Sequence, residues 1–318
     1  MKQRWIALVI GSTFLVTACA GTQDEHIRLI VPFEAGTPTD TVARALAPCM
    51  GDRFGTDMVV ENRTGEQGVR ATREFVEAGV DGRALLVTPA GPPVVAPELD
   101  PEVDYDLLDF HFVGVAHSTP LILFTAGNSP YDTAGTLFAA ARAGAAPVEV
   151  VHTGASMTEE LALGELNALE ETRLEPRQVG SDAEALRGVV DGDYPAGLTT
   201  VSADHLAKVG SGEIRVLAAG GEFRQDYLPD APTFTRTEIL PRIPVDTVVI
   251  GPANPSDTMF LALSGALDEC LTTQDVRRDI GAVFVPAEPV RHGDLVSRYW
   301  DLQNAVSRAQ SRSDPEDR

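Results

Sequence analysis

The stretch Arg28–Met50, RLIVPFEAGTPTDTVARALAPCM, decides the fold, because an apolar strand passes through a short Gly/Pro turn directly into a helical pattern. Gly36 lets the backbone approach a ligand closely, and Pro38 fixes the direction of the chain. Thr39 or Asp40 can cap the helix, whose first N–H groups and dipole favour an anion. The pattern predicts either a plain strand–helix turn or a site that holds a carboxylate through main-chain N–H groups.

Strand-like apolar runs alternate with helical patterns in the first third of the chain. We expect strands within 27–33, 57–69 and 84–91, and helices at 41–55 and 70–79. This βαβαβ order predicts a parallel sheet with helices on its faces. Ligands of such sheets lie beyond the carboxyl ends of the strands. The loops 34–39 and 88–91 occupy such positions.

A Pro-rich acidic connection at 92–110 is followed by a second series of the same kind. Strand-like runs are expected at 111–116, 120–127, 148–154, 214–223 and 246–255, and helices at 132–143, 158–171, 182–190, 256–271 and 294–307. Two α/β units with an excursion and a return predict two lobes joined by crossing strands. A cleft between lobes is a common place for a small-molecule site.

Charge and motif content narrow the function classes. The chain has 318 residues and a formal net charge of −22, which argues against a nucleic-acid partner. Its six histidines follow no metal-ligand spacing, and the common catalytic signatures are absent, so we expect neither metal nor cofactor. Absence of motifs does not exclude an enzyme, because catalytic residues can be far apart in sequence.

The first residues are typical of export. Lys2 and Arg4 precede an apolar stretch over 5–18 that is short for a membrane span. Cys19 follows two small residues, which resembles a bacterial lipoprotein cleavage box. We expect a signal peptide at 1–18, lipidation of Cys19 and a tether at 19–26, and therefore an exported protein anchored to the membrane by lipid, facing the periplasm or the cell exterior. The alternative is an ordinary signal peptide with an incidental cysteine.

The two remaining cysteines, Cys49 and Cys270, each follow apolar residues at helical spacing, so each belongs to a core-facing stripe. They are either two free buried thiols or one disulfide, which an exported protein favours. The sequence leaves these two alternatives open.

Several segments, taken in order, resemble one known family. The stretch 27–47 is similar to a P-F-x-x-G-G-x-x-D loop followed by a helix, and VVENRTGEQG (59–68) to an E-N-R-x-G-A-x-G segment. LPDAPTF (228–234) after a strand, and IGPANP (250–255), resemble later signatures. The chain thus resembles the solute-binding proteins of tripartite tricarboxylate transporters, the Bug family (TctC-like extracytoplasmic receptors).

The resemblance implies an α/β fold, a two-lobed clamp of the type II periplasmic-binding-protein kind, in which each lobe is a mostly parallel sheet flanked by helices. Lobe 1 would comprise 27–118 plus 250–318, and lobe 2 would comprise 119–249. The expected partners are a small carboxylate ligand, such as a di- or tricarboxylate, and the membrane permease subunits of a tripartite transporter. Catalysis is not expected.

The resemblance also implies a ligand site between the lobes. Its predicted residues are Phe33, Ala35, Gly36, Thr39, Asp40, Thr88, Pro89, Ala90, Thr153, Gly154, Ala155, Ser156 and Thr199. Two acidic residues, Glu34 and Glu160, depart from the family pattern. They either point to solvent or pair with an amino group, which would favour an amino acid or another zwitterion. Alternative functions are a ligand-sensing partner of a membrane receptor and a surface hydrolase acting on a carboxylate derivative.

Overall fold

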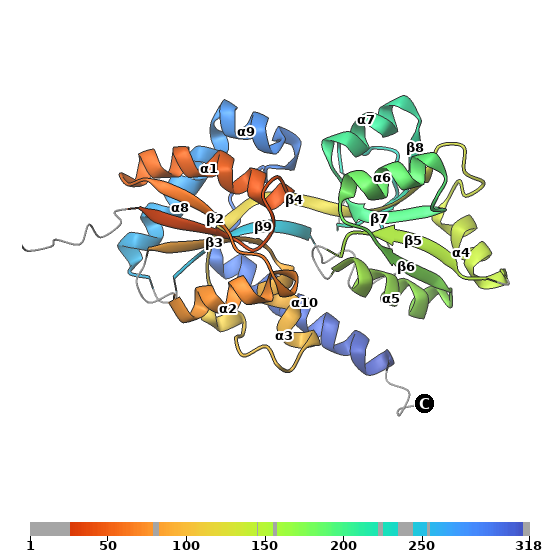
Figure 1. Ribbon diagram of the computed structural model, residues 1–318, viewed down its shortest axis with the longest axis horizontal. Coiled ribbons are helices and arrows are strands. Elements are labelled where there is room, and N and C mark those ends of the chain that lie inside the picture. The colour runs from red at the N-terminus through yellow and green to blue at the C-terminus, as the bar shows by residue number, and fades with distance from the viewer. Residues whose placement is uncertain are drawn as a thin grey trace, which may run out of the picture.

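Two long strands connect the two halves of the molecule. β4 (His111–Ala126) and β9 (Pro244–Gly251) run between the lobes, as Figure 1 shows, and pair antiparallel along most of their common length. The computed structural model describes residues 26–78, 83–144, 146–154, 158–221, 225–234, 244–252 and 255–313. The expected signal peptide, Cys19 and most of the tether lie outside these ranges, so they stay predictions.

Lobe 1 is formed mainly by the two ends of the chain. Its elements are β1 (Ile27–Val31), α1 (Pro38–Phe54), β2 (Met58–Asn62), α2 (Val69–Ala78), β3 (Ala84–Pro89), α3 (Ala96–Leu99), α8 (Asp257–Thr272), α9 (Gln274–Ile280) and α10 (His292–Ser313). Short helical turns add η1 (Glu66–Gly68), the π-helical η2 (Gly91–Val95), η3 (Leu107–Asp109) and η4 (Ala282–Phe284).

Lobe 2 is formed by the middle of the chain. Its elements are α4 (Ala134–Ala143), β5 (Val148–His152), α5 (Thr158–Glu170), β6 (Leu174–Gln178), α6 (Asp182–Asp191), β7 (Ala196–Thr200), α7 (Ala203–Ser211) and β8 (Ile214–Ala219).

The strand order, β2-β1-β3-β9-β4-β7-β5-β6 with β8 also paired to β4, places the crossing strands in the centre. β1, β2 and β3 run parallel in lobe 1, and β5, β6 and β7 run parallel in lobe 2. Every antiparallel pair between named strands involves β4 or β9. The two-lobed α/β clamp is therefore confirmed, whereas its predicted lobe limits stay predictions.

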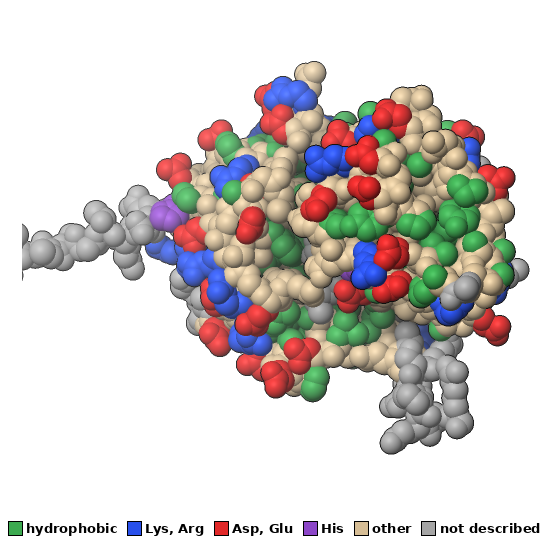
Figure 2. Space-filling view, turned by 45° about the vertical axis from the view of Figure 1, so that its right-hand side comes forward, with side chains coloured by type: hydrophobic (Ala, Val, Ile, Leu, Met, Phe, Trp, Pro, Cys, Tyr) green, Lys and Arg blue, Asp and Glu red, His purple; other side chains and the backbone are tan. Residues whose placement is uncertain are grey.

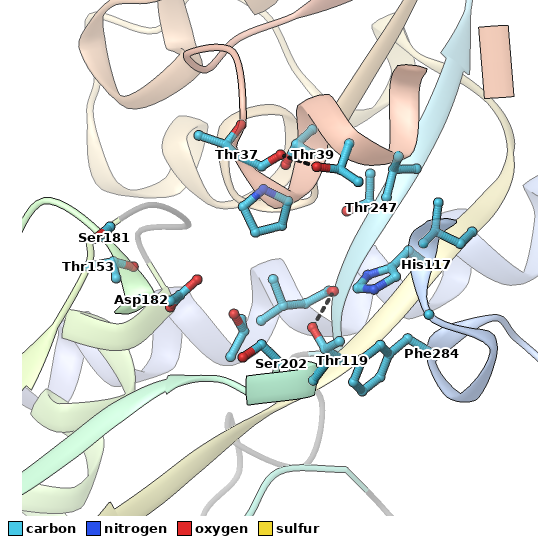
Figure 3. A pocket seen from close by; sticks show the side chains of 18 of the residues that line it. Thr37, Thr39, His117, Thr119, Thr153, Ser181, Asp182, Ser202, Thr247 and Phe284 are labelled. Atoms are coloured by element: carbon cyan, nitrogen blue, oxygen red, sulfur yellow. Dashed lines mark hydrogen bonds between the residues drawn. The ribbon is translucent and has the colours of Figure 1, made fainter. Parts of the chain in front are cut away.

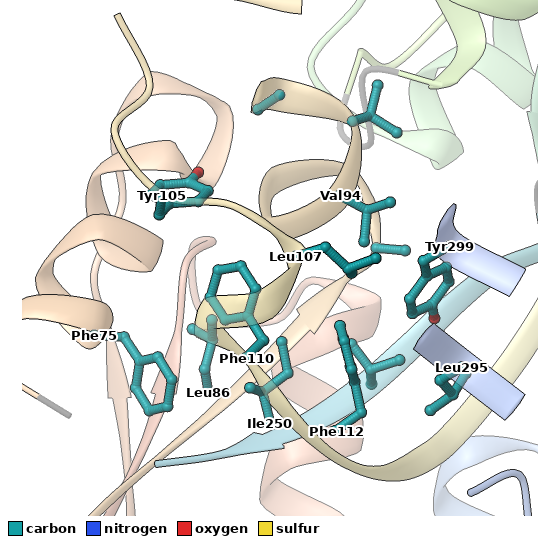
Figure 4. Packing of buried hydrophobic residues seen from close by; sticks show 14 of the residues in the cluster. Phe75, Leu86, Val94, Tyr105, Leu107, Phe110, Phe112, Ile250, Leu295 and Tyr299 are labelled. Atoms are coloured by element: carbon teal, nitrogen blue, oxygen red, sulfur yellow. The ribbon is translucent and has the colours of Figure 1, made fainter. Parts of the chain in front are cut away.

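The inner strands of each lobe are covered on both faces and are apolar throughout rather than alternating, whereas the edge strands β2 and β6 are partly exposed. β3 is an example, since all six of its residues are buried. One lobe 1 core lies under α2, α3 and α10 and contains Phe75, Phe112 and Tyr299 (Figure 4). The other lies under α1, α8 and α9. Lobe 2 likewise has a core on each face.

Several elements differ from the prediction. The runs at 111–116 and 120–127 form the single strand β4, because its register shifts near Gly114 and His117 keep it paired to β9 as it bends. The connection 92–110 contains η2, α3 and η3 rather than an irregular chain. β6, β7, α7 and α9 were not predicted, since β6 carries exposed polar residues and the other three are short.

The structure joins Cys49 and Cys270 in a disulfide between α1 and α8. Both helices pack against the same lobe 1 core, so the bond links the two chain segments that build this lobe. This resolves the pair of alternatives that the sequence left open.

Candidate ligand-binding cleft

Helix α1 begins at the turn that opens the chain. Thr37 is its N-cap and accepts a hydrogen bond from the Asp40 N–H at 3.4 Å, while Pro38 takes the first helical position. A missing N–H costs nothing at that position. The prediction that Thr39 or Asp40 caps the helix was wrong, because Thr37 stands directly before a proline that favours the first turn.

The Asp40 side chain stabilises the turn before α1 and does not line the cleft. Its carboxylate accepts hydrogen bonds from the Gly36 N–H, Asn62 Nδ2 and Arg44 Nε, each at 2.8 Å. Burial raises the pKa of Asp40, but the hydrogen bonds from Arg44, Gly36 and Asn62 outweigh it and leave the pKa lowered. Gly36 adopts a φ of 87°, and its N–H donates to Asp40 rather than to a ligand. The negative charge of Asp40 is balanced by Arg44.

A cleft of about 720 Å³ separates the lobes at this turn (Figure 3). From lobe 1 it is lined by 33–39, Thr41, Val42, Pro89, Arg278, Asp279, Ile280, Gly281 and Phe284. From lobe 2 it is lined by Thr153, Glu159, 180–183, Leu186 and 200–204, and the crossing strands add His117, Thr119, Val245 and Thr247.

Three helices begin at this cleft, and each has a hydroxyl N-cap among the lining residues. These caps are Thr37 for α1, Ser181 for α6 and Ser202 for α7. Helix N-termini present unpaired N–H groups and partial positive charge, so their convergence favours an anionic ligand. The sequence predicted the helix at 182–190 but not its place at the cleft, and it did not predict α7. Ser181 followed by Glu184 at the third place is a typical helix start.

The predicted site residues fall into three groups. Those that line the cleft are Phe33, Ala35, Gly36, Thr39, Pro89 and Thr153. Among the described residues, those that do not line it are Asp40, Thr88, Ala90, Gly154 and Thr199. Ala155 and Ser156 lie outside the described residues.

The residues of the second group are held within the protein. The Thr88 hydroxyl donates to the Pro89 carbonyl, and Ala90 is buried where η2 begins. Gly154 has a φ of 68° and lies against Gln178. Thr199 Oγ1 is 3.2 Å from the buried His205 Nε2, because strand alternation turns Thr199 inward and leaves Thr200 facing the cleft.

The two acidic departures lie in different surroundings. Glu34 lines the cleft. Glu160 is 57% exposed, and its carboxylate is 3.8 Å from Nε2 of the buried His152, so it does not face the cleft. His117 does line the cleft, and burial lowers its pKa to about 4, so it is a neutral group at ordinary pH.

A sequence profile described as "Tripartite tricarboxylate transporter family receptor" matches residues 42–281. The chain belongs to this family. It is 31% identical to protein BugT of Bordetella pertussis over 216 residues, which are 65% of this chain and 64% of BugT. It is 27% identical over 240 residues to a UPF0065 protein of Agrobacterium vitis, covering 73% and 68% of the two chains.

Solved structures share the fold of this receptor. MatC from Rhodopseudomonas palustris, solved with bound malate, has a TM-score of 0.72 at 23% identity, covering 91% of this chain and 99% of MatC. The periplasmic binding protein BugD has a TM-score of 0.73 at 20% identity, with 90% and 97% covered. R. palustris Rpa4515, solved with adipate, has a TM-score of 0.70 at 20% identity, with 91% and 96% covered.

Proposed function

We propose that this receptor captures a small carboxylate in the cleft between its lobes and delivers it to the membrane permease subunits of a tripartite tricarboxylate transporter. It binds its solute and does not transform it. The observation that carries the proposal is the N-terminus of α1, which opens into the cleft under the Thr37 cap while the neighbouring Asp40 charge is balanced by Arg44.

The comparisons support a carboxylate as the ligand class. The related folds of MatC and Rpa4515 were solved with malate and adipate, both of which carry two carboxylates. A ligand that contacts both lobes stabilises the closed state over the open one, because only the closed state offers both sets of contacts. The permease would recognise the closed conformation of the ligand-bound receptor.

Export and lipid anchoring at Cys19 complete the proposed role, since an anchored receptor stays close to its permease. In the described part of the chain, no helix has the length and apolar character needed to cross a membrane. The intact mass of the protein purified from membranes tests the anchor, because acylation adds the mass of its lipid chains to a chain that begins at Cys19.

The sharpest test of the carboxylate site is a charge introduced at Thr39. This side chain lines the cleft in the first turn of α1, where an acidic residue is compatible with the helix dipole. We expect Thr39→Asp to fold normally and to weaken carboxylate binding at least about 10-fold, because two like charges would meet at the same N–H groups. Isothermal titration calorimetry measures the change, after native mass spectrometry and thermal-shift screening with malate, adipate, succinate and citrate have identified a binder.

Thr39→Asn is the matched control, because it has nearly the same shape as Asp without the charge. It should bind within a few-fold of the unchanged protein. Equal binding by both variants would place the carboxylate elsewhere. Failure of every carboxylate to stabilise the unchanged protein at millimolar concentration would refute the proposed function itself.

A further inference from the structure

We propose that the solute carries a positively charged amine in addition to its carboxylate, and that Asp182 and Glu159 of lobe 2 form the subsite that binds the amine. This inference rests on the proposed function and narrows its ligand class to small amino carboxylates.

Asp182 is the first residue of α6, and its carboxylate points into the cleft beside Thr153 and Ser181 (Figure 3). Its Oδ1 atom is buried and, within the part of the chain that the structure describes, has no hydrogen-bond partner. A buried carboxylate oxygen without a partner is unfavourable, so a partner from the ligand would relieve a cost that the free protein carries. An ammonium group is such a partner, since it supplies both hydrogen-bond donors and the opposite charge.

Glu159 adds a second negative charge to the same wall. Its side chain is only 1% exposed and accepts a hydrogen bond from the Thr153 hydroxyl at 3.0 Å. Burial first, and the Glu159 charge second, raise the pKa of Asp182 to about 7. The two carboxylates repel each other across the cleft wall, and a cation between them would remove that repulsion.

Few positively charged side chains of the protein lie near enough to offset the negative charge of Asp182 and Glu159. Arg278 is the one Lys or Arg among the described lining residues, and it is already paired with Asp275 at 2.7 Å and Asp279 at 2.9 Å. Asp204 adds a further carboxylate to the lobe 2 side of the cleft, whereas Glu34 lines it from lobe 1. On the outer face shown in Figure 2, acidic and basic side chains are scattered among hydrophobic and other residues. A ligand that carries carboxylates alone would meet repulsion at lobe 2.

The helix N-termini on the two sides of the cleft differ in how their positive partial charge is balanced. α6 and α7 each place an acidic residue of their own first turn in the cleft, Asp182 and Asp204, so their positive ends are already matched. At α1 the first-turn acid is Asp40, which is buried and paired with Arg44. Lobe 1 thus favours the carboxylate and lobe 2 favours the amine, and a solute with both groups would hold the lobes together.

The test compares amino acids with the corresponding acids that lack the amine. Isothermal titration calorimetry at pH 7.5 would use L-aspartate against succinate, L-glutamate against glutarate, and 4-aminobutyrate against butyrate. We expect the best-binding amino acid to bind at least about 10-fold more tightly than its partner acid, as a charge-assisted hydrogen bond would provide. Asp182→Asn should abolish this ratio while the partner acid keeps its affinity within about threefold.

Three further measurements keep the result interpretable. Asp191→Asn is the control, because Asp191 is exposed at the far end of α6 and does not line the cleft, so the change should alter the ratio less than about threefold. Glu159→Gln should reduce the ratio in the same direction as Asp182→Asn. The melting temperature of ligand-free Asp182→Asn should not fall, since the substitution removes a buried charge. A fall would mean that Asp182 is a structural group and would overturn the inference.

The remaining outcomes separate the two proposals. Equal or tighter binding of succinate and glutarate, weakened together with the amino acids by Asp182→Asn, would overturn the amine subsite. That result would leave the carboxylate receptor intact, with a protonated Asp182 donating to a second carboxylate. Binding of neither class of acid would overturn both proposals.

Discussion

Arg298→Met is expected to lower the free energy of unfolding by about 2–4 kcal/mol, because it leaves the buried carboxylate of Asp246 without its positively charged partner. Asp246 lies on β9, opposite Ser118 of β4, where the two strands pass between the lobes. Its side chain is 0% exposed, and Arg298 Nη1 of α10 donates to its Oδ2 at 2.9 Å. Methionine keeps the length of the side chain but supplies no charge. Urea denaturation at neutral pH measures the loss.

The same variant should show a specific pH dependence. Burial raises the pKa of Asp246 above its ordinary value of 3.8, and Arg298, Ser118 and Tyr299 lower it only in part. The folded state therefore binds more protons than the unfolded state, so this group's contribution to stability falls as pH rises above about 4. Without Arg298 the pKa rises further. The stability difference between variant and unchanged protein should thus be largest at neutral pH and shrink toward pH 4.

Two comparisons identify the cause. Arg278→Met removes a side chain that is 65% exposed and paired with exposed acids, so it should change stability by no more than about 0.5 kcal/mol. The double variant Asp246→Asn, Arg298→Met should recover most of the loss, because no buried charge remains. An Arg298→Met variant that costs no more than Arg278→Met, or a loss that does not depend on pH, would contradict the assigned role.

The first strand, its turn and the following helix were predictable because their signals are local. Apolar residues over 27–31 require a buried strand, and Pro38 with Gly36 requires a turn, whatever lies elsewhere in the chain. The place where the helix begins was missed, since Thr37 as N-cap depends on where Pro38 sits in the first turn. The network under the turn was also missed, because Asn62 reaches Asp40 only when β2 pairs beside β1.

The lobe 2 wall of the cleft was the least predictable part. Ser181 and Ser202 are ordinary helix caps in the sequence, and only the folded arrangement brings both to the cleft that the N-terminus of α1 also lines. Thr199 and Thr200 are equivalent in the sequence, and the strand register decides that Thr200 faces the cleft. The burial of the Asp182 Oδ1 atom could not be foreseen, because an acidic residue after a serine cap is usually a solvated one.

The disulfide between Cys49 and Cys270 ties together two segments that lie 221 residues apart in the sequence. Its removal should shift the unfolding equilibrium strongly, since the closed loop covers most of the chain and restricts the unfolded state. We expect Cys49→Ala, Cys270→Ala to lower the free energy of unfolding by about 2–4 kcal/mol. Alanine is the suitable replacement because Cys270 is fully buried and serine would bury an unpaired hydroxyl.

Reduction provides the matching control for this variant. Dithiothreitol during urea unfolding should lower the stability of the unchanged protein toward that of the double variant and leave the double variant unaffected. Peptide mass spectrometry after alkylation in denaturant without reductant should find no label on Cys49 or Cys270. Label on both cysteines, together with equal stability of the two proteins, would contradict the bond and leave α1 and α8 joined by packing alone.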